Sequence, residues 1–384
     1  MDIWKHQMPK GMCLKSDGFA SNLSDPQSAF TLRHYCESKG IPYQDQGLPV
    51  ALESFLAYGL EFQKKMVPEL EEKMVTAVEP MELGFRLRLD DGESFTAGRV
   101  VVAVGITYFQ RMPDVLAGLR DEYVTHSSRH NELGGFKGRD VTILGAGSSA
   151  IDIAVLLRRI GAKVRMITRG PALTFHVPFK TIFPKWFIPV LRPKTGLGPG
   201  WRSRFCTDAP LIFRLLPVNF RLLVVRRHLG PSPGWFIKAS DLENVPVLTG
   251  TQIKKAEIKG GRVHLKLIQK DGAELDVETD HLISATGYKP DLRRLPFLNE
   301  KLIAAIDSVQ QTPVLSPQFE SSVPGLYFIG LASANTFGPM LRFAYGSAYA
   351  ARRLSRHLEK VGCANSKRPD SGFALHQNLA PSGD

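Results

Sequence analysis

The chain has 384 residues, of which 43% are hydrophobic and 9% aromatic, a composition typical of a globular protein with room for two domains. No apolar run approaches the roughly 18 residues needed to span a bilayer, and the first residues lack the pattern of a signal peptide, so we expect no integral membrane segment and a cytoplasmic location. The net charge of +12 suits anionic ligands, but the sequence holds no recognised nucleic-acid-binding module or dense Lys/Arg block, which excludes nucleic acid as an expected partner.

The residues before position 70 are predicted to form loops and two helices. Residues 4–24 contain glycines, a proline and mixed polar side chains, which are typical of a loop. Residues 25–37, which begin with Asp-Pro, predict a short helix, and residues 50–62 predict another.

A small antiparallel meander followed by one buried strand is predicted twice along the chain. The first copy has strands near residues 74–78, 84–89 and 94–97, then a buried strand at 100–104 that ends at Gly105. The second copy has strands near residues 253–258, 263–268 and 275–277, then a buried strand at 281–285 that ends at Thr286 and Gly287. The repeated order indicates an internal duplication.

No metal site and no redox-active dithiol are predicted. The cysteines are scattered and form no C-x-x-C: they are Cys13, Cys36, Cys206 and Cys363. His126 and His130 are four residues apart, which suits a metal pair on a helix, but the neighbouring pair of glycines favours a loop. No third ligand is evident, so we expect no metal.

Residues 141–169 predict the first βαβ unit of a dinucleotide-binding domain. An apolar run is followed by a glycine turn, a helix over residues 151–159 and a second apolar run, and the turn reads Gly145, Ala146, Gly147, Ser148, Ser149, Ala150. Gly145 permits the tight turn, Gly147 leaves room for a pyrophosphate, and Ala150 lets helix and strand pack closely. The helix N-terminus presents free N–H groups to the phosphates. A chance glycine turn is the alternative, but it leaves the two strands and the helix unexplained.

Arg169 indicates which dinucleotide this unit prefers. A site selective for NAD usually ends its second strand with an acid, whereas an arginine suits the 2′-phosphate of NADP. No acid occurs between Arg169 and Asp208, so the sequence predicts NADP(H). The alternative is a solvated arginine after a strand.

Residues 171–246 form an insertion rich in proline, aromatic and basic residues. Between Arg165 and Lys238 the only acid is Asp208. The insertion is either a lid or substrate-binding segment, or a packed surface subdomain with a solvated basic face. A peripheral membrane contact is a weaker alternative.

The last part of the chain is predicted to close the fold. An apolar run at residues 326–329 ends at Gly330, and a helix is expected from about Pro339, after Gly338. Residues 360–384 are polar and are expected to be a disordered tail.

The two copies of the meander differ in what comes before them. The second copy follows the βαβ unit, whereas the first has none, and the chain begins where the second strand of such a unit would have just ended. This asymmetry is the most informative feature of the sequence.

Five motifs together resemble the two-dinucleotide-binding-domain flavoproteins, and within them the flavin-containing monooxygenase and lysine/ornithine N-hydroxylase-like group. They are Trp4 with MPKGMCLKS (8–16), VVVAVG (100–105), His126-Ser127 ahead of FKGRDVTILGAGSSAIDIA, LISATGYKPDL (282–292) and VPGLYFIG (323–330). The resemblance implies a three-layer α/β fold with two Rossmann-like domains, the first lacking its N-terminal βαβ unit. An FAD domain would comprise residues 1–138 and 288–384, and an NADP(H) domain residues 139–287.

The resemblance also implies two cofactors and the residues that hold them. In this family NADPH reduces FAD, and the reduced flavin with oxygen oxygenates a soft nucleophile. NADP(H) would be held by Gly145, Ala146, Gly147, Ser148, Ser149, Ala150 and Arg169. The flavin junction would be lined by Gly105, His126, Thr286, Gly287, Gly330 and Gly338, with Lys10, Ser16 and the residues between them beside the isoalloxazine ring.

The chain departs from the family at its FAD fingerprint. The G-x-G-x-x-G near the N-terminus, with an acid ending the next strand, is absent. Either the chain is a truncated or mis-started form of a longer protein, which we expect because the rest keeps the family pattern, or it no longer binds FAD normally. The linker motif F-x-G-x-x-x-H is matched only loosely by Gly118 and His126, and the family's asparagine falls near Gln7. We therefore assign no catalytic residue.

The sequence thus predicts an FAD-dependent, NADPH-using oxidoreductase, foremost a monooxygenase of an amine or sulfur-containing small molecule. One alternative is a flavin-dependent NADPH reductase or dehydrogenase without oxygenation. The other is a truncated, non-catalytic protein that binds NADP(H).

Overall fold

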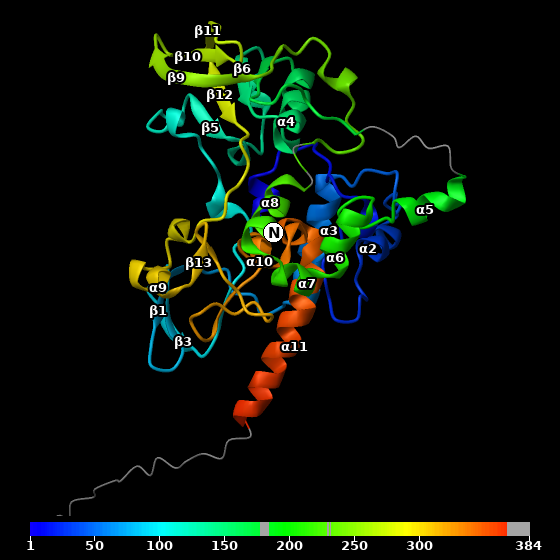
Figure 1. Cartoon of the computed structure of the whole chain (residues 1–384), viewed down its shortest axis with the longest axis vertical. Coiled ribbons are helices and arrows are strands. Elements are labelled where there is room, and N and C mark those ends of the chain that lie inside the picture. The colour runs from blue at the N-terminus through cyan, green and yellow to red at the C-terminus, as the bar shows by residue number, and fades with distance from the viewer. Residues whose placement is uncertain (177–183, 229, 231, 367–384) are drawn as a thin grey trace, which may run out of the picture.

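The computed structural model describes residues 1–176, 184–228, 230 and 232–366 (Figure 1). Within them the strands form a five-stranded sheet, two three-stranded antiparallel sheets and two two-stranded sheets. The predicted α/β class, with Rossmann-like units, is confirmed. No helix in these residues is long and apolar enough to cross a membrane.

The five-stranded sheet is the centre of the second unit, and all its strand pairs are parallel. Its order is β5-β12-β6-β7-β8, with bounds Val124–His126, His281–Ser284, Asp140–Leu144, Lys163–Ile167 and Val247–Leu248. Helix α4 (Ser148–Arg159) connects β6 to β7, as the glycine pattern predicts. Every residue of β12 is buried, which is typical of a strand covered on both faces.

Three layers of this unit pack through two hydrophobic clusters. On one face, α4 packs through Ile151 and Ile153 against Ile143 of β6. On the other face the predicted meander packs through Val263 and Leu265. The meander strands are β9 (Thr251–Lys259), β10 (Arg262–Gln269) and β11 (Glu274–Thr279). The sheet is thus enclosed between a helix and an antiparallel sheet.

The first unit repeats this arrangement on a smaller parallel sheet. Its meander strands are β1 (Val75–Pro80), β2 (Phe85–Leu89) and β3 (Ser94–Ala97). They share a core with two parallel strands, β4 (Val100–Val102) and β15 (Leu326–Phe328), and with the long helix α11 (Ser347–Ser366). Within the described residues the parallel sheet here has two strands, against five in the second unit. Between β12 and β15 lie α9 (Glu300–Ala305), β13 (Ser308–Val309) and β14 (Thr312–Pro313).

The N-terminal part forms its own aromatic cluster and differs locally from the prediction. Its helices are α1 (Asp2–His6), α2 (Leu32–Lys39) and α3 (Leu52–Met66), so the expected loop over residues 4–24 overlaps a helix at its start. The helix expected from residue 25 begins only at Leu32, because the Asp25 carboxylate accepts the backbone N–H groups of Gln27, Ala29 and Phe30 and folds them into a turn. The Thr31 side chain then caps α2.

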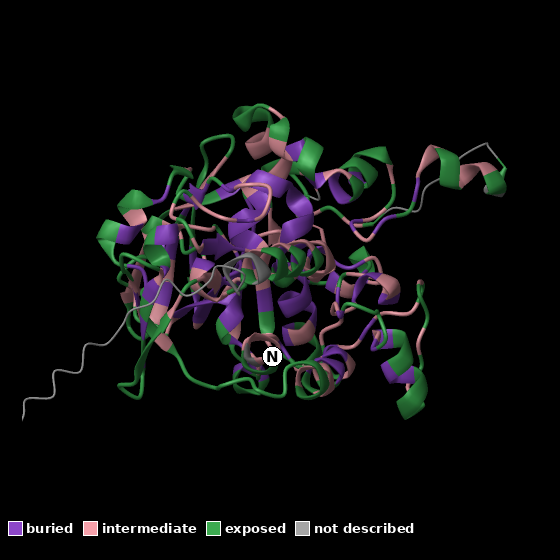
Figure 2. Ribbon diagram, turned by 90° about the horizontal axis from the view of Figure 1, so that it is seen from below, coloured by how far each residue is buried: buried purple, intermediate pink, exposed green. Residues whose placement is uncertain are grey.

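The insertion contains four short helices in its described part. They are α5 (Ile188–Leu191), α6 (Trp201–Asp208), α7 (Pro210–Leu215) and α8 (Val218–Arg227). Helices α7 and α8 contact α10 (Ala334–Phe337), whereas α8 itself has no buried residue. In Figure 2 the buried residues are concentrated on the central elements and the exposed ones on the periphery. Residues 177–183, 229 and 231 of the predicted insertion lie outside the described residues.

The C-terminal helix differs from the prediction at both ends. The segment from Pro339 forms two 3₁₀ turns, Pro339–Arg342 and Ala344–Gly346, before α11 begins at Ser347. The tail expected to be disordered from residue 360 is helical through Ser366, and residues 367–384 lie outside the described residues. Figure 1 shows α11 extending away from the body of the molecule.

Two segments that connect the units, the crossings around Gln110 and Tyr288, are hydrogen-bonded to each other. Gln110 and Tyr288 form an antiparallel bridge, flanked by a bond from Arg111 N–H to the Gly287 carbonyl (2.9 Å) and one from Lys289 N–H to the Phe109 carbonyl (2.7 Å). The proposed division at residue 138 differs from the sheet pairing, because β5 already belongs to the five-stranded sheet.

Candidate functional site

The glycine turn after β6 fits only glycine at its first position. Gly145 has φ +142°, and a Cβ there would penetrate the carbonyl oxygen of Ala285, the residue after β12. Its own N–H donates to the Ile167 carbonyl at the end of β7 (2.9 Å). The turn is therefore closely packed between the carboxyl ends of two neighbouring strands.

Helix α4 starts directly after this turn without a side-chain cap. Gly147 is the N-cap residue, and no side chain accepts a hydrogen bond from the first turn. The N–H groups of Ser148, Ser149 and Ala150 thus begin a helix whose N-terminus carries a partial positive charge. This is the arrangement that binds a phosphate group.

Two further predicted residues lie at the same edge of the sheet. Thr286 and Gly287 follow β12, whose end touches the Gly145 turn through Ala285. The Thr286 hydroxyl contacts the Ser284 hydroxyl (3.0 Å) and donates to the Arg111 carbonyl on the other crossing. The structure therefore brings residues 145–150, Thr286 and Gly287 together.

Arg169 lies just beyond the end of β7, the strand next to β6. Its side chain is exposed and makes no ion pair with any residue that the structure describes. A free guanidinium at the carboxyl edge of the sheet is available to a 2′-phosphate.

His126 connects β5 to the crossing at Gly287. Its Nδ1 accepts the Ser128 backbone N–H (3.2 Å), so the neutral ring carries its proton on Nε2, which donates to the Gly287 carbonyl (3.2 Å). Burial lowers the pKa of His126 to about 4, so the ring is neutral at pH 7. His126 thus fixes the position of a predicted site residue.

His130 and His281 share one hydroxyl. The Nδ1 of His281 donates to the Glu122 carbonyl (3.1 Å), so its Nε2 must accept the Thr125 hydroxyl proton (2.8 Å). Thr125 Oγ1 in turn accepts from His130 Nε2 (2.6 Å). Burial lowers the pKa of both rings to about 4. Because both rings are hydrogen-bonded through Thr125, we assign them a packing role. The described residues contain no group of three potential metal ligands.

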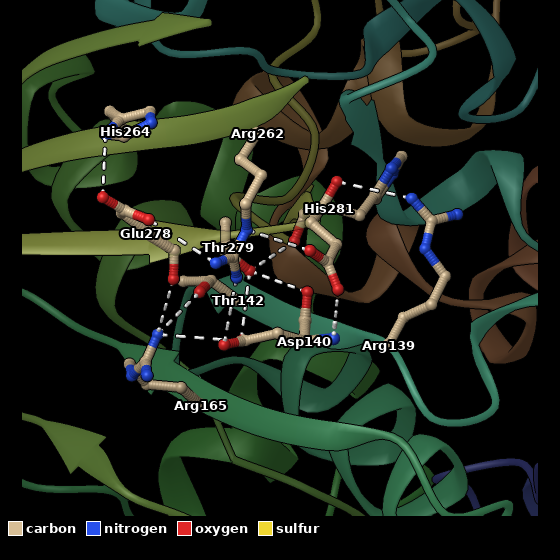
Figure 3. Close-up of polar contacts among 10 residues, drawn as sticks. Arg139, Asp140, Thr142, Arg165, Arg262, His264, Glu278, Thr279 and His281 are labelled. Atoms are coloured by element: carbon tan, nitrogen blue, oxygen red, sulfur yellow. Dashed lines mark hydrogen bonds and ion pairs between the residues drawn. The ribbon is translucent and has the colours of Figure 1, made fainter. Parts of the chain in front are cut away.

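A charged network lies at the opposite, amino-terminal edge of the sheet (Figure 3). Arg262 of β10 forms an ion pair with Asp280 (3.0 Å), and the Asp280 carboxylate accepts the Asp140 backbone N–H (2.8 Å). The Thr279 hydroxyl donates to the Asp140 carbonyl (2.9 Å), and Arg165 forms an ion pair with the Asp140 carboxylate (3.8 Å). These contacts join the meander to the sheet away from the glycine turn, so we assign them a structural role.

Three predicted glycines belong to the first unit. Gly105 (φ +60°) and Gly330 (φ +68°) follow the paired strands β4 and β15, so they lie at one edge of that sheet. Gly338 (φ +103°) precedes Pro339, and the fully buried Phe213 ring of α7 lies 3.4 Å from where its Cβ would be. The insertion therefore packs on the Gly338 turn, which fits both the lid and the packed-subdomain alternatives.

A hollow of about 590 Å³ lies beside α11, between that helix and residues 19–31. Four cations of α11 line it together with two tyrosines: Arg352, Arg353, Arg356, Lys360, Tyr345 and Tyr349. No carboxylate lines it among the described residues, and none of the four cations has an ion-pair partner there. The hollow therefore suits an anionic ligand with an aromatic ring.

The N-terminal segment that contains Lys10 and Ser16 lies against the second unit. The Lys10 backbone N–H donates to the Asn131 carbonyl (3.0 Å), and its ammonium pairs with Glu132. A Cβ on Gly11 would meet Leu156 of α4 at 3.6 Å. The Ser16 hydroxyl forms a local hydrogen bond with the Ser21 hydroxyl (2.8 Å). This segment thus packs beside α4.

Sequence reasoning missed Asp152, which lies one helical turn beyond the glycine turn. Lys15, within the predicted segment 10–16, acts electrostatically on this acid. Asp152 occupies the fourth position after Ser148 on α4 and is 9% exposed. An acid on the otherwise apolar buried face of this helix was the available signal, because acids are rarely buried without a partner.

The comparisons with known proteins agree with this architecture. A family model described as pyridine nucleotide-disulphide oxidoreductase matches residues 57–186. The probable indole-3-pyruvate monooxygenase YUCCA3 of Arabidopsis thaliana is 25% identical over 288 residues, which cover 71% of this chain and 62% of that protein. A ferredoxin–NADP reductase of Mesorhizobium japonicum is 34% identical over 103 residues, 26% of this chain and 29% of that protein. The chain thus spans less than two thirds of these curated relatives.

Solved structures share the fold over nearly the whole chain. The FAD-bound cadaverine monooxygenase DfoA of Erwinia amylovora has a TM-score of 0.69 at 19% identity and covers 100% of this chain, with 91% of its own chain matched. The ornithine N-hydroxylase KtzI of Kutzneria sp. 744, with reduced FAD, NADP⁺ and L-ornithine, has a TM-score of 0.72 at 16% identity and covers 94% of this chain, with 90% of its own matched. The predicted resemblance to N-hydroxylating flavoprotein monooxygenases is confirmed at the level of fold.

Proposed function

We propose that this protein is an FAD-dependent, NADPH-using monooxygenase of an amine or sulfur-containing small molecule. The observation that carries the proposal is the uncapped N-terminus of α4 after the Gly145 turn, with Arg169 just beyond the neighbouring strand and without an ion-pair partner among the described residues. It occurs in a fold whose solved neighbours include enzymes bound to FAD and NADP⁺. A cytoplasmic location and the absence of a nucleic-acid partner are part of this proposal.

The residues fit NADP(H) at the second unit. The backbone N–H groups of Ser148 and Ser149 would hold the pyrophosphate, and Arg169 would hold the 2′-phosphate. Gly145 allows the tight turn that presents the helix N-terminus to the phosphates, because any side chain there would overlap the Ala285 carbonyl oxygen. His126 and Thr286 hold the two crossings in place beside it.

The residues that would hold the flavin belong to the first unit. Gly105 and Gly330 present bare backbone near the ends of its parallel strands, and the hollow beside α11 supplies four cations that have no ion-pair partner among the described residues. When bound, FAD supplies hydride acceptance from NADPH and the activation of oxygen. Phe213 and the rest of α7 cover the Gly338 turn, which would exclude water from this region.

The proposal is tested by flavin retention. We expect the purified chain, incubated with excess FAD and freed of unbound cofactor, to keep a visible flavin band that bleaches on addition of NADPH. If no flavin remains bound while NADPH still binds, the protein is a nucleotide-binding protein without flavin chemistry. If flavin is retained and bleaches, formation of an oxygenated product from an amine or thioether would distinguish a monooxygenase from a flavin-dependent reductase.

A flavin-dependent reductase is the second candidate. It is favoured by the similarity to ferredoxin–NADP reductases, at 34% and 33% identity over stretches of 103 and 99 residues. A reductase would consume NADPH and release peroxide with every candidate substrate, without an oxygenated product.

Arg169→Ala is expected to raise the dissociation constant for NADPH by about 10- to 100-fold, because a charge-assisted bond to a phosphate contributes about 1.5–3 kcal/mol. Binding of NADH, which lacks the 2′-phosphate, should change by less than about twofold. Fluorescence titration with both dinucleotides measures this. Arg159→Ala removes an exposed cation at the other end of α4 and serves as the control. Equal losses for NADPH and NADH would refute the 2′-phosphate assignment.

A further inference from the structure

Asp152 is a buried acid one helical turn beyond the proposed phosphate site. The Ser148 hydroxyl, at the first position of α4, donates to its Oδ2 (3.1 Å). Residues four apart on a helix lie on the same face, so the carboxyl group approaches the N-terminus where the dinucleotide phosphates would bind. A negative charge at this place would repel them.

One cation acts electrostatically on this acid, and a second cation acts on the first. Lys15, on the N-terminal segment, acts electrostatically on Asp152, and its ammonium donates to the Ser232 carbonyl in the insertion (2.7 Å). Arg342, which repels Lys15, donates to the carbonyls of Val225 (2.9 Å) and His228 (3.4 Å). Neither cation has an ion-pair partner within 4.0 Å among the described residues. The surroundings therefore carry positive charge that an anion can offset.

The acid itself is close to its midpoint at neutral pH. Burial raises the pKa of Asp152 to about 7, although the Ser148 bond and Lys15 act in the opposite direction. Asp152 also acts on a second titratable group, Cys13. Burial and the charges of Glu53 and Asp152 raise the pKa of this thiol, whereas Arg159 lowers it. Cys13 is thus a neutral thiol near pH 7.

The two forms of the carboxyl group direct Ser148 differently. The ionised carboxylate accepts a hydrogen bond from the Ser148 hydroxyl, so this hydroxyl cannot also donate to a phosphate oxygen. The protonated carboxyl can donate to Ser148 Oγ instead, and the serine O–H is then free to donate to a phosphate. Protonation therefore removes a repelling charge and supplies a donor in one step.

We propose that Asp152 is a positioning residue of the dinucleotide site, which takes up a proton when an anionic dinucleotide binds and thereby turns the Ser148 hydroxyl toward it. This inference rests on the proposed binding of NADP(H). It assigns Asp152 and Lys15 a joint role, because Lys15 limits how far the carboxyl is driven toward the neutral form in the free protein.

The test is isothermal titration of NADP⁺ between pH 6 and pH 9, repeated in buffers of different ionisation enthalpy. We expect binding by the unmodified protein to weaken about tenfold over this range, with net proton uptake near pH 7, because a one-unit rise in the pKa on binding corresponds to a factor of ten. NAD⁺ should show the same slope, which separates Asp152 from the titration of the 2′-phosphate.

Three variants separate the contributions. Asp152→Asn, whose amide mimics the protonated carboxyl, should bind with less than a twofold change across the pH range. Ser148→Ala should keep part of the slope, because the charge of Asp152 remains. Cys13→Ser is the control and should keep all of it. Equal slopes for the unmodified protein and Asp152→Asn would overturn this inference alone. Absence of NADP⁺ binding by both would overturn the proposed function as well.

Discussion

Gly145→Ala is expected to abolish dinucleotide binding and to lower the free energy of unfolding by about 3 kcal/mol or more. The residue has φ +142°, which strains any side chain, and the new methyl group would overlap the Ala285 carbonyl oxygen. Backbone atoms at the end of β12 cannot move aside cheaply, because that strand is buried and hydrogen-bonded on both sides. The glycine turn and the start of α4 must therefore be displaced.

Gly161→Ala provides the matched control. Gly161 also has a positive φ (+85°), but no atom lies within 4 Å of its ideal Cβ position. Its replacement by alanine should lower the free energy of unfolding only by the backbone strain, about 1–2 kcal/mol, and should leave NADP⁺ binding unchanged. Urea denaturation and titration with NADP⁺ measure both variants. Equal losses of stability would show that the contact with Ala285 is not what requires glycine at position 145.

The protein is expected to lose several kcal/mol of stability between pH 6.5 and pH 4. Three buried histidines, His126, His130 and His281, have folded pKa values of about 4, below the ordinary value of 6.5. The unfolded chain therefore binds more protons in this interval. The stabilisation is complete above pH 6.5 and is lost as the pH falls through 4, at on the order of 3 kcal/mol for each ring.

Urea denaturation at a series of pH values checks this expectation. His281→Gln should be less stable at pH 7, because the bonds to Thr125 and Glu122 are altered, but its stability should fall less steeply with acid. His6→Gln, at an exposed position at the end of α1, should keep the original slope. A stability that is flat from pH 6.5 to pH 4 would contradict the neutral, buried state of the three rings.

The sequence predicted the elements whose signals are local. Alternation of apolar residues with turn dipeptides located both meanders, and the spacing of Gly145, Gly147 and Ala150 located the βαβ unit within one to three residues. These features depend on neighbours along the chain. The position of Gly145 against Ala285 also follows from the fingerprint, because the fold requires neighbouring strands to end together.

Other features depend on contacts between distant residues and could not be derived in this way. Strand β5 has three residues, too few for a periodic signal, and its place beside β12 is set by pairing. The turn at Asp25 replaces the start of a predicted helix because one carboxylate accepts three backbone N–H groups. Lys15 acts electrostatically on Asp152 across 137 positions of sequence, so their pairing could not be derived from the neighbours of either residue along the chain.

The paired crossings at Gln110 and Tyr288 restrict how the two units can move. Two chain segments that run side by side and are joined by backbone hydrogen bonds resist stretching and sliding, because either motion would break the bonds at Arg111 and Lys289. Twisting about the axis of this ribbon needs only small changes of backbone torsion spread over several residues. Of the motions at this ribbon, rotation is therefore opposed least by the ribbon itself.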